Sequence, residues 1–217
     1  MTSLLGTVNP NIFSVVSTSN NKAITLVVRG TASYPVVESI TVSTFPETTA
    51  HAVAMPATVN AGDLLIMPFS NEGTITVTTP AGWTAKASSG ATRDRFNIFV
   101  KVAIGTEGGT TVDCVTSSNG HAVAQVFRIS GSYAGALTDI EAAAFVNDNV
   151  TGTDPNPPSL TASWGAGRNL FIAIANSDMT DHAVEPAPFA DAPAQTQYRL
   201  MLSDGTDHDV PNLNITS

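Results

Sequence analysis

The sequence predicts an all-β protein: an antiparallel β-sandwich of jelly-roll type, built from two related halves and preceded by an N-terminal β-hairpin arm. The first observation is an apparent repeat of two similar apolar runs, at 63–67 and 169–173. Each run is followed by an aromatic residue shortly after a proline, Trp83 in the first copy and Phe189 in the second, and the two copies are 106 positions apart throughout. The second is composition, since only 12% of residues are charged, against roughly 25% in an average domain. The third is a series of short strand-like segments with turn residues between them, at a spacing of about 8–12 residues that is typical of sandwiches.

The first 35 residues differ from the rest of the chain and predict the arm. Two apolar runs, 13–18 and 23–29, flank the polar stretch Ser19-Asn20-Asn21-Lys22, which is the pattern of a hairpin. An isolated hairpin is marginal in water, so this one should pack on its own domain or contact another molecule. The docking residues would be Phe13, Val15, Ile24, Leu26 and Val28.

The sandwich should then occupy 36–217, with halves at about 36–135 and 136–217. In the long strand expected at 93–104, Phe96, Ile98 and Val100 share one face, while Asn97, Phe99 and Lys101 share the other. Asn119-Gly120 predicts a tight hairpin turn, because both residues tolerate positive φ. The other first-half strands are expected at 37–44, 51–58, 63–70, 73–79, 110–116 and 121–129.

The second half should contain strands at 139–145, 159–163, 170–176, 195–203 and 213–216, with a proline-rich loop at 151–158. It has no counterpart to the strand at 121–129. Either the molecule continues beyond the given sequence or another segment fills that position, and the N-terminal hairpin, from the same or a neighbouring copy, is a candidate. No long segment has helical periodicity, so little helix is expected.

Charge and hydropathy exclude several classes of function. The net charge of −9 and pI near 4.6 disfavour nucleic-acid binding, which needs a basic patch. No uncharged apolar run approaches the ~18 residues of a membrane span, and the first residues do not resemble a signal peptide. A soluble protein made without export is expected. Cys114 is the single cysteine and should be a small buried apolar residue.

The residues with chemical potential do not form a recognisable catalytic set. The sequence has four histidines but no nucleophile elbow, zinc pattern or phosphate loop. The acidic clusters around Asp204 and Asp178 match no EF-hand and are expected to be solvated turns. We therefore expect no catalytic residue, cofactor or metal. Trp83, Trp164 and Tyr133 are possible platforms for a glycan or partner, although Trp83 is better explained as packing material.

Several stretches resemble a module common in structural proteins of tailed bacteriophages. They are Pro56-Ala57-Thr58-Val59-Asn60-Ala61-Gly62-Asp63-Leu64-Leu65, Thr78-Thr79-Pro80-Ala81-Gly82-Trp83, Phe99-Val100-Lys101-Val102-Ala103 with Gly105-Thr106-Glu107-Gly108-Gly109-Thr110, Ala124-Gln125-Val126-Phe127-Arg128-Ile129-Ser130-Gly131 and Pro157-Pro158-Ser159-Leu160-Thr161-Ala162-Ser163-Trp164-Gly165. The resemblance covers about 36–176 and carries no catalytic signature.

The resemblance implies a structural virion protein, made in the host cytoplasm and placed on the particle exterior. The expected role is capsid decoration through contacts between copies and with the major capsid protein, without nucleic acid or membrane. The alternative is a tail-fibre or baseplate module that binds host glycan, which predicts an exposed Trp83 or Trp164 beside Asp or Asn. An enzyme such as a glycan depolymerase is a third, less supported interpretation.

Overall fold

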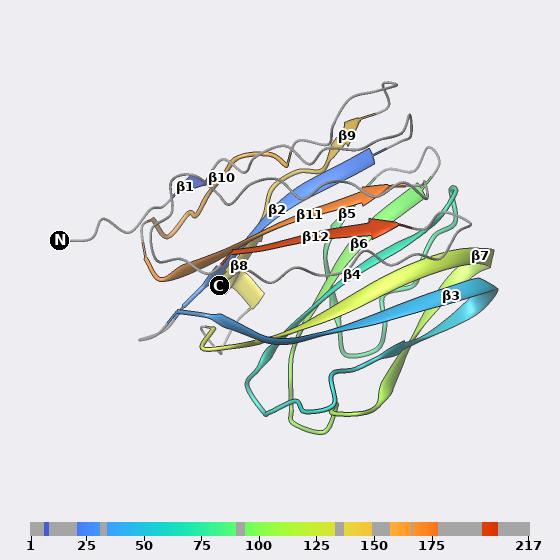
Figure 1. The fold of residues 1–217 in the computed structure, drawn as a ribbon, viewed down its shortest axis with the longest axis horizontal. Helices are drawn as coiled ribbons and strands as arrows, with labels where there is room; N and C mark the ends of the chain where they lie inside the picture. The colour runs from blue at the N-terminus through green and yellow to red at the C-terminus, as the bar shows by residue number, and fades with distance from the viewer. Residues whose placement is uncertain are drawn as a thin grey trace.

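The computed structural model describes residues 7–8, 21–30, 34–89, 94–132, 137–148, 157–165, 167–177 and 197–203, and this part of the chain confirms the β-sandwich (Figure 1). The main sheet has the spatial order β3 (Val36–Ala54), β7 (Thr111–Ser130), β4 (Leu64–Glu72), β6 (Asp94–Val102) and β5 (Thr84–Ser88). The second sheet has the order β12 (Gln197–Ser203), β11 (Asn169–Ser177), β2 (Asn21–Arg29) and β8 (Ile140–Ala142), and β9 (Val146–Asp148) also pairs with β2. β1 (Thr7–Val8) pairs with β10 (Leu160–Thr161), and η1 (Leu137–Asp139) is a single helical turn.

The two sheets pack face to face over one apolar core. The second sheet contributes Ile24, Leu26 and Val28 from β2 and Leu170, Ile172 and Ile174 from β11. The main sheet contributes alternate residues of β4, β6 and β7, including Phe96, Ile98 and Val100, which confirms the face predicted for that strand. Each fully buried side chain of this kind stabilises the fold by roughly 1.5–3 kcal/mol, so this layer is the main source of stability.

The other face of the main sheet is also apolar. The long strands β3 and β7 form a two-stranded ribbon, and the half of this ribbon at 48–54 and 111–120 folds back to cover that face (Figure 1). Val53 and Cys114 from the folded part pack on Leu65, Met67 and Phe99 of the main sheet. The pairing of β3 with β7 shifts register twice between Phe45 and Ala50, where the ribbon bends. The main sheet is therefore the middle of three layers.

The bend replaces the hairpin turn expected at Asn119-Gly120, and that prediction is wrong. β7 runs without interruption from Thr111 to Ser130, and β3 likewise joins the two strands expected at 37–44 and 51–58. Gly120 lies where the ribbon bends, and a Cβ built on it would approach Cδ1 of Ile75 to 2.6 Å. The glycine therefore provides space for a close approach, and its φ is not positive.

The segment expected to be an N-terminal arm is instead a central strand of the sandwich. β2 pairs antiparallel with β11 over its whole length and with β8 and β9 on its other side. Ile24, Leu26 and Val28 are completely buried in the core, so the idea of a separate docking arm is wrong for this strand. In this position the apolar side chains of β2 are removed from water, and its backbone N–H and C=O groups find hydrogen-bond partners in the neighbouring strands. Phe13 and Val15 lie outside the described residues.

Other expected elements differ in detail. The segment at 73–79 makes only a short bridge from Val77 to Thr116, while β5 was not predicted. β11 pairs in parallel with β12, in contrast to the antiparallel pairing of β4 with β6. Phe189 and the strand expected at 213–216 lie outside the described residues.

The outer face of the second sheet is covered by the segment at 157–165. Phe171, Ala173 and Ala175 of β11 pack with Ala162, and Leu160 and Trp164 border this third cluster. The small side chains of β11 on this face leave room for the segment to approach closely.

Because β2 is part of the core, truncating it should destabilise the whole sandwich. We expect Leu26→Ala to lower the free energy of unfolding by about 2–5 kcal/mol, measured by urea denaturation. Val42→Ala, at a position that is 40% exposed on β3, is the matched control and should cost less than about 1 kcal/mol. Equal, small effects of the two substitutions would contradict the assignment of β2 to the core.

Candidate functional site

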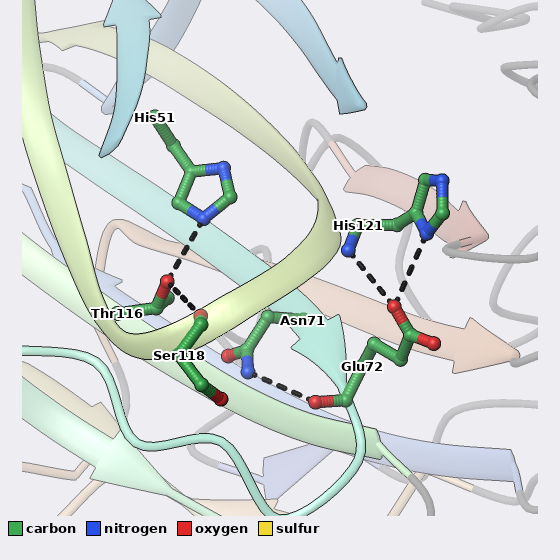
Figure 2. Close-up of polar contacts among 6 residues, drawn as sticks. All are labelled: His51, Asn71, Glu72, Thr116, Ser118 and His121. Carbon is green, nitrogen blue, oxygen red and sulfur yellow. Dashed lines mark hydrogen bonds and ion pairs between the residues drawn. The ribbon is translucent and has the colours of Figure 1, made fainter. Parts of the chain in front are cut away.

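The densest polar contacts lie where β3 and β7 bend, near the end of β4 (Figure 2). His51 of β3 is fully buried, with its ring against Phe45 and Phe69 at centroid distances of 5.2 and 5.6 Å. Its Nε2 lies 3.2 Å from Oγ1 of Thr116, whose hydroxyl donates to the Ser118 carbonyl at 2.9 Å. Since the hydroxyl has one hydrogen, His51 Nε2 must carry a proton and donate it to Thr116.

This tautomer leaves Nδ1 of His51 as a buried acceptor without a hydrogen-bond partner among the described residues. Burial lowers the pKa of His51 below 6.5, because the charged imidazolium would lose its hydration. The side chain therefore acts as a neutral bridge between the folded ribbon and the main sheet. Its closed surroundings do not suit a catalytic base.

A second contact joins β4 to β7 through Glu72 and His121 (Figure 2). Oε2 of Glu72 accepts the backbone N–H of His121 at 2.9 Å and lies 3.1 Å from Nδ1 of the same residue. The backbone hydrogen bond is the main cause that lowers the pKa of Glu72. The Glu72 side chain is 51% exposed, so water screens the pair. The contact holds β7 against the end of β4.

The face of the main sheet beneath the ribbon has further buried polar groups. Asn71 lies directly opposite Arg95, and Asn97 lies directly opposite Phe69. Oδ1 of Asn71, Nε of Arg95 and Nδ2 of Asn97 are buried without a protein hydrogen-bond partner in the described chain. These groups could hydrogen-bond a small polar molecule, but they include no nucleophile. Cys114 lies in the part of β7 that covers this face. Burial raises the pKa of its thiol to about 12, with a smaller contribution from Asp113. The thiol is therefore unreactive.

The two tryptophans have different surroundings. Trp83 is only 8% exposed and packs in the cluster under the folded ribbon, so it cannot stack on a glycan. Trp164 is half-buried, and its Nε1 donates to Oδ1 of Asn169 at 2.8 Å. The guanidinium of Arg29 lies 5.8 Å from its ring centroid. Tyr133 lies outside the described residues.

Acidic side chains that the sequence did not single out lie close to Trp164. Arg29 forms an ion pair with Asp139 at 3.2 Å, and Glu141 accepts hydrogen bonds from the backbone and hydroxyl of Ser163. Asp139 is 110 residues from Arg29 in the sequence, and Glu141 is 22 residues from Ser163. No local sequence pattern could therefore reveal these contacts. Together with Asn169 they make a partly exposed aromatic and polar cluster beside β10.

Within the described ranges, no group of His, Cys, Asp and Glu residues is arranged to hold a metal ion. The clusters around Asp178 and Asp204 lie outside those ranges. In the same part of the chain, no helix is long and apolar enough to cross a membrane.

No family model, curated protein or solved structure matches the chain. The function must therefore be inferred from the residues and the fold.

The buried His51 should make stability depend on pH. Its folded-state pKa lies below the 6.5 of the unfolded chain, so the unfolded state binds more protons as pH falls through 6.5, and stability is lost. We expect His51→Leu to reduce the loss of unfolding free energy between pH 7.5 and 5.5, where one proton contributes at most about 1.4 kcal/mol per pH unit. Urea denaturation at several pH values measures this slope.

His121→Gln is the matched control, because it changes a histidine of the same strand pair whose side chain is 24% exposed, whereas His51 is completely buried. This variant should keep the contribution of His51 to the dependence of unfolding free energy on pH. If the two variants changed the slope equally, burial of His51 would not be its cause.

Proposed function

We propose that the chain is a structural protein of a tailed-bacteriophage particle, most simply a capsid-decoration protein on the particle exterior. The resemblance in sequence is the observation that carries this proposal. The fold adds to it by explaining what the shared motifs do. Their residues determine turns and internal ion pairs, which is what a structural role requires.

The motif glycines occupy backbone conformations that other residues adopt only with strain. Gly82 has φ of 78° in the turn before β5, and Gly105 has φ of 90° at a point where an added Cβ would lie 3.0 Å from the backbone N of Ala61. The same left-handed region is occupied by Gly62, Gly109, Gly131 and Gly165, all within the stretches that resemble the phage module. The motifs thus encode the turns of the sandwich.

The charged motif residues pair with one another. Asp63 and Arg128 form an ion pair at 2.5 Å, and Lys101 and Glu107 form another at 3.0 Å. Burial alone would raise the pKa of Glu107, but hydrogen bonds from the backbone of Ile104 and from Lys101 outweigh it and lower the pKa to about 2. The carboxylate also accepts the N–H groups of Gly105 and Thr106. These charges stabilise the loops and are not arranged for chemistry.

Assembly would rely on strand addition and apolar burial between copies and against the major capsid protein, where backbone hydrogen bonds provide affinity. The acidic net charge of −9 suits a solvent-facing exterior.

The position on the particle can be tested directly. Antibodies against the purified chain, applied to intact particles of the phage that carries it, should label the head surface in electron micrographs. An electron cryo-microscopy map should show the sandwich there in many copies. Label confined to the tail, or a chain present only in the soluble lysate, would contradict capsid decoration.

A second candidate function is glycan binding, and only Trp164 now supports it. Its half-buried ring lies beside Arg29 and Asn169, and aromatic and polar groups together are common in sugar sites. Trp83 no longer contributes, because it is buried.

If this cluster binds glycan, Trp164→Ala should weaken binding at least about tenfold, which corresponds to 1.4 kcal/mol. A glycan array followed by calorimetry on any hit measures the loss. Thr84→Ala, on the exposed edge strand β5 of the other sheet, should leave binding unchanged. The absence of any glycan bound by the unmodified protein would exclude this function.

A further inference from the structure

The two sheets share one strand order, although their strands come from different places in the chain. In the main sheet β4 is flanked by β7, and β7 by β3; in the second sheet β11 is flanked by β2, and β2 by β8 and β9. All these pairs are antiparallel. β4 and β11 are the two strands related by the apparent sequence repeat. β2 therefore occupies the position in the second sheet that β7 occupies in the main sheet.

The register supports the same correspondence. Leu64 and Ile66 of β4 lie opposite Ile129 and Phe127 of β7. The matching residues of β11, Leu170 and Ile172, lie opposite Val28 and Leu26 of β2. All eight residues belong to the core between the two sheets, so the corresponding positions of the two strand pairs face the same core.

A contact across the core shows that the repeated strands also face each other. Nδ2 of Asn176 donates to Oγ of Ser70 at 2.6 Å, and these two residues are 106 positions apart, the offset of the repeat. Such a contact fits a local twofold relation between β4 and β11, and this relation does not extend to their other neighbours, because β12 runs parallel to β11 whereas β6 runs antiparallel to β4. The second unit is therefore completed by a strand that precedes the first unit in the sequence.

The covalent link between β2 and the main sheet is short. Gly30 donates its N–H to the carbonyl of Arg168, next to β11, and also makes an isolated bridge to Ser132, just after β7 of the main sheet. Val36 is the first residue tied to the main sheet, opposite Ser130. Only residues 31–35 lie between these anchors, and they include a proline.

The second sheet cannot do without β2, since Ala23, Ile24, Leu26, Val27 and Val28 are all completely buried. Yet every contact that β2 makes with β8, β9 and β11 is the same whether the strand belongs to the same chain or to a neighbouring copy. Domain swapping exchanges an identical element between copies, and in the sequence only residues 31–35 separate β2 from the main sheet.

We propose that β2 is an exchangeable closing strand, and that copies of this chain assemble by donating β2 to the second sheet of a neighbour. A strand on the same chain competes at an effective concentration of roughly millimolar. Exchange therefore needs copies held at a comparable density, as on an assembled surface. The inference rests on the fold and holds or fails independently of where the protein lies on a particle.

Two single-cysteine variants test the exchange. Ala23 and Ala175 are directly opposite in β2 and β11 and are both buried, and Cα atoms of such antiparallel pairs lie within disulfide range. Each variant also keeps the natural Cys114, which is buried only in the folded chain, and the control pair below measures its contribution. We expect Ala23→Cys and Ala175→Cys chains, refolded together at about 1 mM, to form a disulfide-linked heterodimer, and to form far less of it at about 1 μM.

The control pair is Ala23→Cys with Thr84→Cys on β5, which should give no heterodimer above background. An equal yield from the control pair would show random collision and overturn the proposal. The unmodified chain, refolded at the same high concentration and analysed by light scattering, should contain dimers or larger species. A chain that is wholly monomeric there overturns the proposal regardless of any disulfide.

Discussion

The structure depends on one constraint: the main sheet is apolar on both faces, so both faces must be covered. Strand β4 is buried along nearly its whole length, and β6 and β7 alternate between two separate apolar clusters. The second sheet covers one face and the folded ribbon covers the other (Figure 1). The bend of β3 and β7, the insertion of β2 and the burial of His51 all follow from this requirement.

The same constraint explains how far the sequence predicted the fold. Period-2 patterns and turn residues predicted the sandwich and the two faces of β6, because local side-chain alternation reports burial directly. They did not predict that Asn119-Gly120 continues a strand, since the space needed by Ile75 is visible only in three dimensions. They did suggest the N-terminal segment as one candidate for the missing strand of the second half, where β2 lies, but they could not give its register, because its partners in β11 are 140 to 156 residues further along the chain.

The candidate site was less predictable than the fold. Trp164 was identified as a possible platform, but Arg29 over its ring comes from β2 and Asp139, the partner of Arg29, comes from η1, so neither carries a local signal. The charged residues of the motifs could be identified in the sequence, but their pairing could not. The structure pairs Asp63 with Arg128 and Lys101 with Glu107, so these residues hold the loops together.

The place of β2 in the second sheet also bears on how the chain is made. At a synthesis rate of about 5–20 residues per second, β2 leaves the ribosome on the order of 10 s before β11. During that time an apolar strand has no lasting partner, although the main sheet can already form. Pairings so distant in sequence also slow folding, because the loop they close is long. Newly made chains should therefore pass through a partly folded stage in which the second sheet is incomplete, and folding factors of the cell have time to act on it.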